Sequence, residues 1–243
     1  MQKFSRVLGV FLLLSLMVSA GLPDKAKAEG VYGYASVDVL TNYVWRGQNL
    51  GDDGVVQPSI HSTKDNLTLN IWSNYDLKRN RNNEVDVTLN YSVESEGMSI
   101  DAGYIYYALK DADDTQELYI SAALEMYLAP TVTLYLDFDE GDGGFLVMSV
   151  GHDISLDEDS SLHFGASASL NIENKVMGGE FTNWYNSELT ASYTMNIAKN
   201  VILEPKMAYS FALSNDAERA IRSASVDNDD KEFYAGVNMT MNF

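Results

Sequence analysis

The chain has 243 residues, a formal net charge of −19, 11% aromatic residues and no cysteine. This acidity argues against nucleic acid or anionic phospholipid as a partner. The lack of cysteine excludes disulfides and a lipoprotein-type anchor, and the length fits one domain.

The amino-terminal segment has the pattern of a secretory signal peptide. Lys3 and Arg6 precede an apolar stretch at residues 7–18, and residues 26–28 read A-K-A, an A-x-A cleavage site. The apolar stretch is shorter than the roughly 20 residues that a transmembrane helix needs. We therefore expect a signal peptide at 1–28 and one mature domain at 29–243.

Alternating apolar and polar residues then recur up to the last residue. A period of two indicates strands with one apolar and one polar face. The clearest example is the final segment, in which Phe233, Val237 and Phe243 belong to the apolar face. With turn signals between them, the segments predict twelve strands at 31–46, 55–63, 67–77, 84–94, 98–109, 116–127, 131–139, 145–154, 161–172, 184–196, 201–212 and 232–243.

The connections between these segments alternate in length. Those after even-numbered strands are mostly tight, such as 95–97, whereas those after odd-numbered strands are longer and more polar, such as 173–183 and 213–231. Short periplasmic turns, long outer loops and an even strand number are typical of transmembrane barrels. We predict an all-β fold, an antiparallel up-and-down transmembrane β-barrel of about twelve strands with both termini periplasmic, in the outer membrane of a Gram-negative bacterium. A soluble periplasmic β-sandwich is the alternative.

Strand alternation assigns most charged residues to the interior, because a charge facing lipid is costly. The predicted pore-lining residues are Arg46, Asp86, Asp101, Glu117, Glu125, Asp137, Glu188, Glu204 and Lys206. These groups either form a selectivity ring or merely hydrate the interior and pair with one another. Aromatic residues near strand ends, including Tyr43, Trp45 and Tyr185, are candidates for the interfacial girdles. Inward aromatics at Trp72, Tyr107, Tyr119 and Tyr135 would narrow the pore.

The first strand carries a short family-like motif. Residues 36–50 read SVDVLTNYVWRGQNL, and a strand with a tryptophan, LTLNIWSNYDL, follows. This arrangement over residues 36–77 resembles the TorF-type porins, with Tyr43, Arg46 and Gly47 as the matching positions. The resemblance implies a barrel and a pore. Phe243 likewise resembles the terminal signal that the barrel assembly machinery reads.

Arg46 follows Trp45 where the first strand is expected to end. Its guanidinium can pair with lumen carboxylates or with lipid phosphate. Either it narrows the pore mouth, or it forms a salt bridge at the rim that orders the loop.

Catalytic and metal-binding patterns are weak. Ser59 with His61, and Ser161 with His163, share a strand face, but neither pair has an identifiable orienting Asn or Asp. The acidic runs at 137–142 and 227–230 do not follow the EF-hand pattern. We predict no enzymatic activity, no cofactor and no metal.

These observations predict an outer-membrane channel for passive diffusion of small hydrophilic solutes, with a weak preference for cations. The alternative is a non-conducting structural or interaction barrel. Expected partners are outer-membrane lipid and lipopolysaccharide, the barrel assembly machinery and small hydrophilic solutes. The solute and the oligomeric state stay open.

Overall fold

The computed structural model describes residues 30–243, so the predicted signal peptide at 1–28 lies outside the described residues. Residues 30–243 form fourteen strands and two helical segments in the order β1 Val31–Leu40, β2 Tyr43–Trp45, β3 Gln48–Gly51, β4 Val55–Lys64, β5 Leu67–Asp76, β6 Arg81–Ser95, β7 Met98–Leu109, β8 Thr115–Leu124, β9 Thr131–Asp137, β10 Gly143–Ser155, β11 Ser160–Ile172, η2 Lys175–Met177, β12 Thr182–Ala198, β13 Val201–Ala212, α2 Asn215–Ala224 and β14 Lys231–Asn242. Among residues 30–243, no helix combines the length and apolarity needed to cross a membrane.

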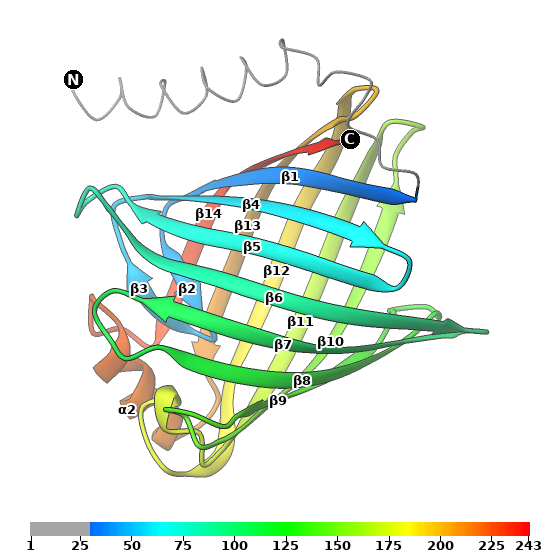
Figure 1. Ribbon diagram of the computed structural model, residues 1–243. Helices are drawn as coiled ribbons and strands as arrows, with labels where there is room; N and C mark the ends of the chain where they lie inside the picture. Colours follow the sequence, from blue (N-terminus) through cyan, green and yellow to red (C-terminus); the bar gives the residue numbers. More distant parts are fainter. Residues whose placement is uncertain (1–29) are drawn as a thin grey trace.

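Twelve of the strands close into one antiparallel barrel (Figure 1). Each strand pairs with its neighbours along the chain, and β1 closes the ring by pairing with both β4 and β14. Beyond β14, the amide nitrogen of Phe243 donates to the carbonyl oxygen of Gly33 at 3.0 Å. Closure leaves no unpaired sheet edge, which is the condition for a sheet to lie in lipid. The predicted twelve-stranded barrel is confirmed.

The two faces of the sheet separate apolar from polar side chains. Apolar residues such as Leu69, Ile120 and Phe233 are 42%, 54% and 61% exposed on the outer surface. Polar residues on the opposite face contact one another across intervening strands. Tyr234 on β14, for example, donates to Glu188 on β12 at 2.9 Å, although β13 lies between them. The apolar outer surface and polar interior are the pattern of a transmembrane barrel.

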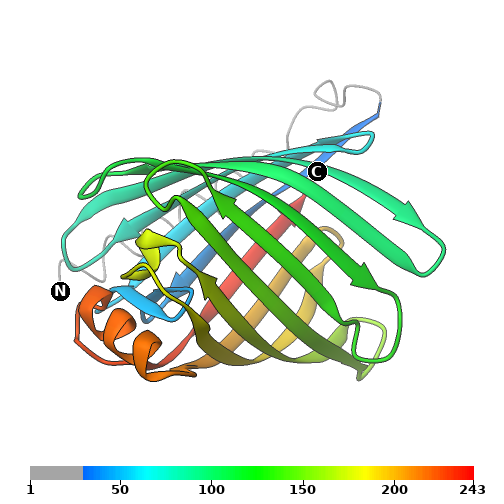
Figure 2. The ribbon, with the colours of Figure 1, turned by 90° about the horizontal axis from the view of Figure 1, so that it is seen from below.

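The two ends of the barrel differ as predicted. Tight turns such as 65–66, 96–97 and 199–200 lie at one end, together with Phe243 and the start of β1. We call this the short-turn end. The opposite, long-loop end carries the β2–β3 hairpin, η2 and α2 (Figures 1 and 2).

The largest difference from the sequence prediction is in the first strand. The strand expected over 31–46 ends at Leu40, and the chain then folds into the β2–β3 hairpin before β4 begins. The hairpin lies within the long-loop end of the barrel rather than continuing the wall (Figure 2). The prediction failed because Tyr43 and Trp45 continue the apolar positions set by Val37 and Val39, although Thr41 and Asn42 between them do not belong to a strand.

Candidate pore and constriction

The β2–β3 hairpin reaches across the lumen. β1 and β4, which hold its base, lie four to six strands away from β8, β9 and β10 around the twelve-stranded ring. The turn of the hairpin is formed by Arg46 and Gly47, with φ values of 50° and 85°. Two positive φ angles in a two-residue loop are the pattern of a type I′ turn, which matches the twist of a hairpin. A non-glycine residue in this region is strained and persists where surrounding contacts hold it.

Arg46 makes those contacts with the opposite wall. Its Nη1 and Nη2 atoms donate to Oε1 and Oε2 of Glu117 on β8 at 2.8 and 2.7 Å. The hydroxyl of Tyr107 donates to the same carboxylate at 2.7 Å. Only 9% of the Arg46 side chain and 1% of the Glu117 side chain are exposed. This bidentate, charge-assisted pair fixes both the position and the charge of the hairpin tip.

Aromatic rings enclose the Arg46 guanidinium. Its central carbon lies 4.5 Å from the ring centre of Trp45, 4.6 Å from that of Tyr135 and 4.5 Å from that of Phe145. At these distances the negative ring faces attract the cation. The tip of the hairpin is therefore held by one carboxylate and by rings from β9 and β10.

The second strand of the hairpin is bound to the loops of the long-loop end. Gln48 donates to the hydroxyl of Tyr185 at 2.9 Å. Asn49 donates through its backbone nitrogen to Ser225 at 3.0 Å and through its side chain to Asp227 at 2.9 Å. A Cβ atom on Gly47 would lie 3.0 Å from Cβ of Asn186, so the turn passes close to β12. The hairpin thus contacts the barrel on several sides.

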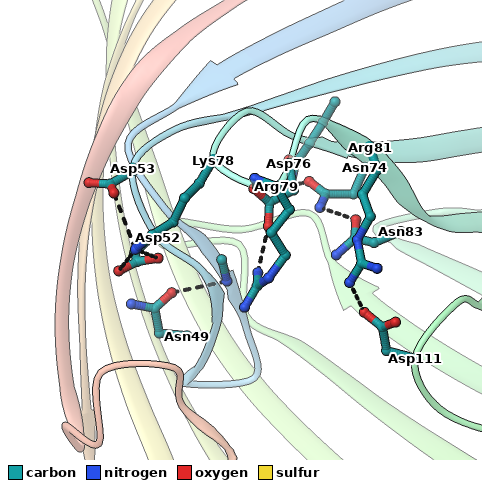
Figure 3. Close-up of polar contacts among 12 residues, drawn as sticks. Asn49, Asp52, Asp53, Asn74, Asp76, Lys78, Arg79, Arg81, Asn83 and Asp111 are labelled. Carbon is teal, nitrogen blue, oxygen red and sulfur yellow. Dashed lines mark hydrogen bonds and ion pairs between the residues drawn. The ribbon is translucent and has the colours of Figure 1, made fainter.

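Charged contacts at the mouth tie the base of the hairpin to the next loop (Figure 3). Lys78, in the β5–β6 loop, lies 2.9 Å from Asp52 and 3.2 Å from Asp53, which follow β3. Hydrogen bonds with these carboxylates raise the pKa of Lys78. Asp76 accepts from Arg79 at 2.5 Å, and Arg81 pairs with Asp111. These pairs are exposed on at least one side, so each contributes little stability by itself.

Two cavities lie on different sides of the hairpin. One, of about 730 Å³, opens at the long-loop end and is lined by Trp45, Glu84, Tyr107, Asp111, Thr115 and Lys175, among others. The other, of about 320 Å³, is lined by Tyr43, Val44, His163, Glu204, Lys206 and Tyr234, among others. No residue lines both. Trp45 borders the first cavity and its neighbour Val44 borders the second, so the hairpin separates them.

The structure distributes the sequence-predicted lining residues over several environments. Glu204 and Lys206 line the smaller cavity, and Lys206 pairs with Asp38. Asp101 accepts from Asn90 at 2.9 Å. On the inner wall, one oxygen of Asp86 is buried without a hydrogen-bond partner.

Asp137 and Glu125 lie at the two ends of their strands. Asp137 is 3% exposed and accepts from Thr115 at 2.9 and 2.8 Å and from the backbone nitrogens of Asp139 and Gly141 at 2.9 Å. Its contacts order the β9–β10 turn. Glu125 lies past the end of β8, exposed in the β8–β9 turn at the short-turn end.

Three aromatics considered for the interfacial girdles lie inside the barrel. Tyr43 and Tyr185 are 6% and 0% exposed, and Trp45 packs against the internal cluster of Phe145, Met177 and Tyr185. Tyr43 and Trp45 belong to the inward hairpin. Tyr185 faces inward at a register shift between β11 and β12, next to the outward-facing Trp184. The hairpin contacts were missed by sequence reasoning, because Arg46-Gly47 is not one of the dipeptides, such as Asn-Gly or Asp-Gly, that mark a two-residue hairpin.

Charge on the inner wall is unbalanced. Arg46 and Lys206 are each paired with a carboxylate. Several other carboxylates on this wall form no ion pair within residues 30–243, among them Glu84, Asp86, Asp101, Glu188 and Glu204. At the mouth, Lys175 lies 3.0 Å from Asp142, and this hydrogen bond raises the pKa of Lys175. The lumen therefore carries an excess of negative groups.

Comparisons with known proteins support the fold and give no family. No protein-family model matches the chain, and no curated protein matches its sequence. Among solved structures, the NanC porin aligns with a TM-score of 0.56 and 10% identity over 87% of this chain and 100% of its own. An outer-membrane channel from Pseudomonas putida F1 aligns with a TM-score of 0.53 and 12% identity over 91% and 99%. The chain has the fold of bacterial outer-membrane channels.

Proposed function

We propose that this protein is a channel in the outer membrane of a Gram-negative bacterium, through which small hydrophilic solutes diffuse passively with a weak preference for cations. The observation that carries the proposal is the inner wall, where several carboxylates lack a cation partner within residues 30–243 and two of them, Glu84 and Glu204, each line one of the two cavities. Such a wall raises the local concentration of cations and lowers that of anions. The charged groups of this inner wall face the lumen and do not contact lipid.

The β2–β3 hairpin is the constriction of this channel. It lies between the two cavities and reaches the opposite wall through Arg46. A twelve-stranded barrel is intermediate between eight-stranded barrels filled by side chains and sixteen-stranded porins with an open channel. A hairpin that fills part of the lumen suits a narrow pore for small solutes.

Topology and assembly belong to the same proposal. The short-turn end, with Phe243, faces the periplasm, and the acidic long-loop end faces outward towards lipopolysaccharide. Phe243 serves as the signal for the barrel assembly machinery. The resemblance of residues 36–77 to TorF-type porins remains a prediction that rests on Tyr43, Arg46 and Gly47.

The proposal treats the barrel as non-enzymatic. His61 Nε2 lies 3.3 Å from Ser59 Oγ, but in the described part of the chain no carboxylate hydrogen-bonds to His61. His163 is bonded to Asp153 at 2.8 Å, whereas Ser161 makes no hydrogen bond with His163 among the described residues. Neither arrangement links a nucleophile, a base and an orienting group.

Conductance of the purified protein in planar lipid bilayers tests the proposal. In a KCl gradient we expect stable ohmic steps and a reversal potential whose sign shows cation preference. An anion-selective pore would contradict the charge assignment. Silence of a correctly folded barrel, shown by a heat-dependent shift in gel mobility, would favour the second candidate.

That second candidate is a non-conducting structural or interaction barrel. The observation that favours it is the set of contacts holding the hairpin across the lumen, from Glu117 on β8 to Ser225 after α2. A plug fixed in this way could close the barrel completely. Uptake of small sugars into liposomes containing the protein would then equal uptake into liposomes without protein.

A further inference from the structure

We propose that Arg46 and Glu117 act as a matched charge pair that sets the ion selectivity of the constriction. This inference rests on the proposed function as a channel. The general excess of acidic residues in the lumen favours cations. The inference adds that this preference requires Glu117 to neutralise the buried Arg46 guanidinium. The pair joins the tip of the hairpin to the opposite wall, at the section where the lumen is divided.

The first step of the argument is the position of the pair beside the larger cavity. Trp45 and Tyr107 both line that cavity. Trp45 stacks on the Arg46 guanidinium at 4.5 Å, and Tyr107 donates to Glu117 at 2.7 Å. One ring contact therefore separates each member of the pair from this cavity. Electrostatic fields extend over such a distance in a confined, low-dielectric lumen.

The second step is the balance of charge around the pair. Arg46 has a single carboxylate partner among the described residues, and that partner is Glu117. The neighbouring Glu84 also lines the cavity and has no ion pair in the described part of the chain. Without Glu117, the guanidinium would face the same cavity as an uncompensated positive charge.

The third step is that removing the charge of Glu117 and removing the charge of Arg46 must shift the ion selectivity in opposite directions. Glu117→Gln keeps a hydrogen-bonding side chain but leaves Arg46 unpaired, which adds a positive charge beside the constriction. Arg46→Gln leaves Glu117 charged, with Tyr107 still donating to it, which adds a negative charge. A purely structural role would give a different result, because loss of either partner would release the hairpin tip in the same way.

The test measures the reversal potential of single variants in planar bilayers under a KCl gradient. We expect the cation-to-anion permeability ratio to fall about threefold or more in Glu117→Gln and to rise in Arg46→Gln. The double variant Arg46→Gln/Glu117→Gln removes both charges and should return the ratio to that of the unaltered protein. Glu125→Gln, in the exposed turn at the short-turn end, is the matched control and should leave the ratio unchanged.

The outcomes separate the two proposals. If the unaltered, folded barrel does not conduct, the proposed function fails before the pair is tested. If it conducts but both single variants shift the ratio in the same direction, or neither shifts it, the charge pair does not set selectivity. A heat-dependent gel shift for each variant shows that the barrel has formed.

Discussion

At the scale of single residues, acidic side chains that look alike in the sequence have different roles in the structure. Glu117 neutralises a cation on the hairpin, whereas Glu188 accepts from a tyrosine on another strand. Asp137 holds a turn, and Glu125 lies outside the strands. Alternation within a strand predicts the face on which a carboxylate lies. It contains no information about a partner from a segment 71 residues away in the chain, as with Arg46 and Glu117.

Asp137 provides a prediction at this scale. Replacing it by Ala removes the acceptor for Thr115 and for two backbone nitrogens, all of them at a buried site. Hydrogen bonds to charged groups contribute more than neutral ones, so we expect a loss of about 3 kcal/mol in the free energy of unfolding. Urea titration of the barrel in lipid vesicles, followed by tryptophan fluorescence, measures this loss.

Asp139→Asn is the matched control. Asp139 lies in the same turn, but its side chain accepts only one hydrogen bond among the described contacts, an exposed one from Gln116 at 2.9 Å. Its replacement should change the free energy of unfolding by less than about 0.5 kcal/mol. Equal losses for the two variants would show that Asp137 does not order the turn.

At the scale of elements, the sequence predicted the barrel wall better than the elements inside it. Every predicted strand except the first begins and ends within three residues of the observed one, because each has a lipid-facing apolar side and a polar side. The hairpin and α2 lie inside the loops, where no lipid imposes a pattern. Helix α2 is instead defined by Ser214, which accepts from Ala217 at its first turn, and by burial of Ala217 and Ile221 in the internal cluster.

Removal of the hairpin is the prediction for this scale. The amide nitrogen of Gly54 donates to the carbonyl oxygen of Thr41 at 2.8 Å, so Asn-Gly between these two residues can replace 42–53 as a tight turn. The two cavities would then join, and we expect single-channel conductance to rise severalfold. Bilayer recordings measure this.

A matched replacement at the opposite end controls for loop shortening in general. Exchange of residues 156–159, the β10–β11 turn, for Asn-Gly should leave conductance unchanged, since this turn lies at the short-turn end. In the unaltered turn, hydrogen bonds from Ser160 and the amide of Asp159 lower the pKa of Asp157.

If removal of the hairpin left conductance unchanged, the constriction would lie elsewhere.

At the scale of the whole molecule, stability in lipid depends on the outer face of the sheet. Ile120, near the middle of β8, is 54% exposed on this face. A basic residue at the bilayer midplane costs about 2 to 4 kcal/mol, and the cost falls to about 0 to 1 kcal/mol near the interface. We expect Ile120→Arg to lower the free energy of unfolding in vesicles by the larger amount.

Tyr127→Arg is the comparison for depth. Tyr127 is 73% exposed in the β8–β9 turn, beyond the end of the strand. Its replacement should have the smaller effect in the same urea titration. Similar costs at the two positions would show that β8 does not cross the hydrocarbon layer as assigned.

The pairing of β1 with β14 has a consequence for the timing of assembly. β4 pairs with one side of β1, but on the other side seven residues, from Tyr34 to Leu40, find their partners in the final strand, about two hundred residues later in the chain. While the chain is being delivered to the membrane, the N–H and C=O groups of β1 on that side need other hydrogen-bond partners, such as the exposed strand edge of another protein. Pairing of β14 with β1 thus displaces that temporary partner, so the barrel is released only when its ring of strands is complete.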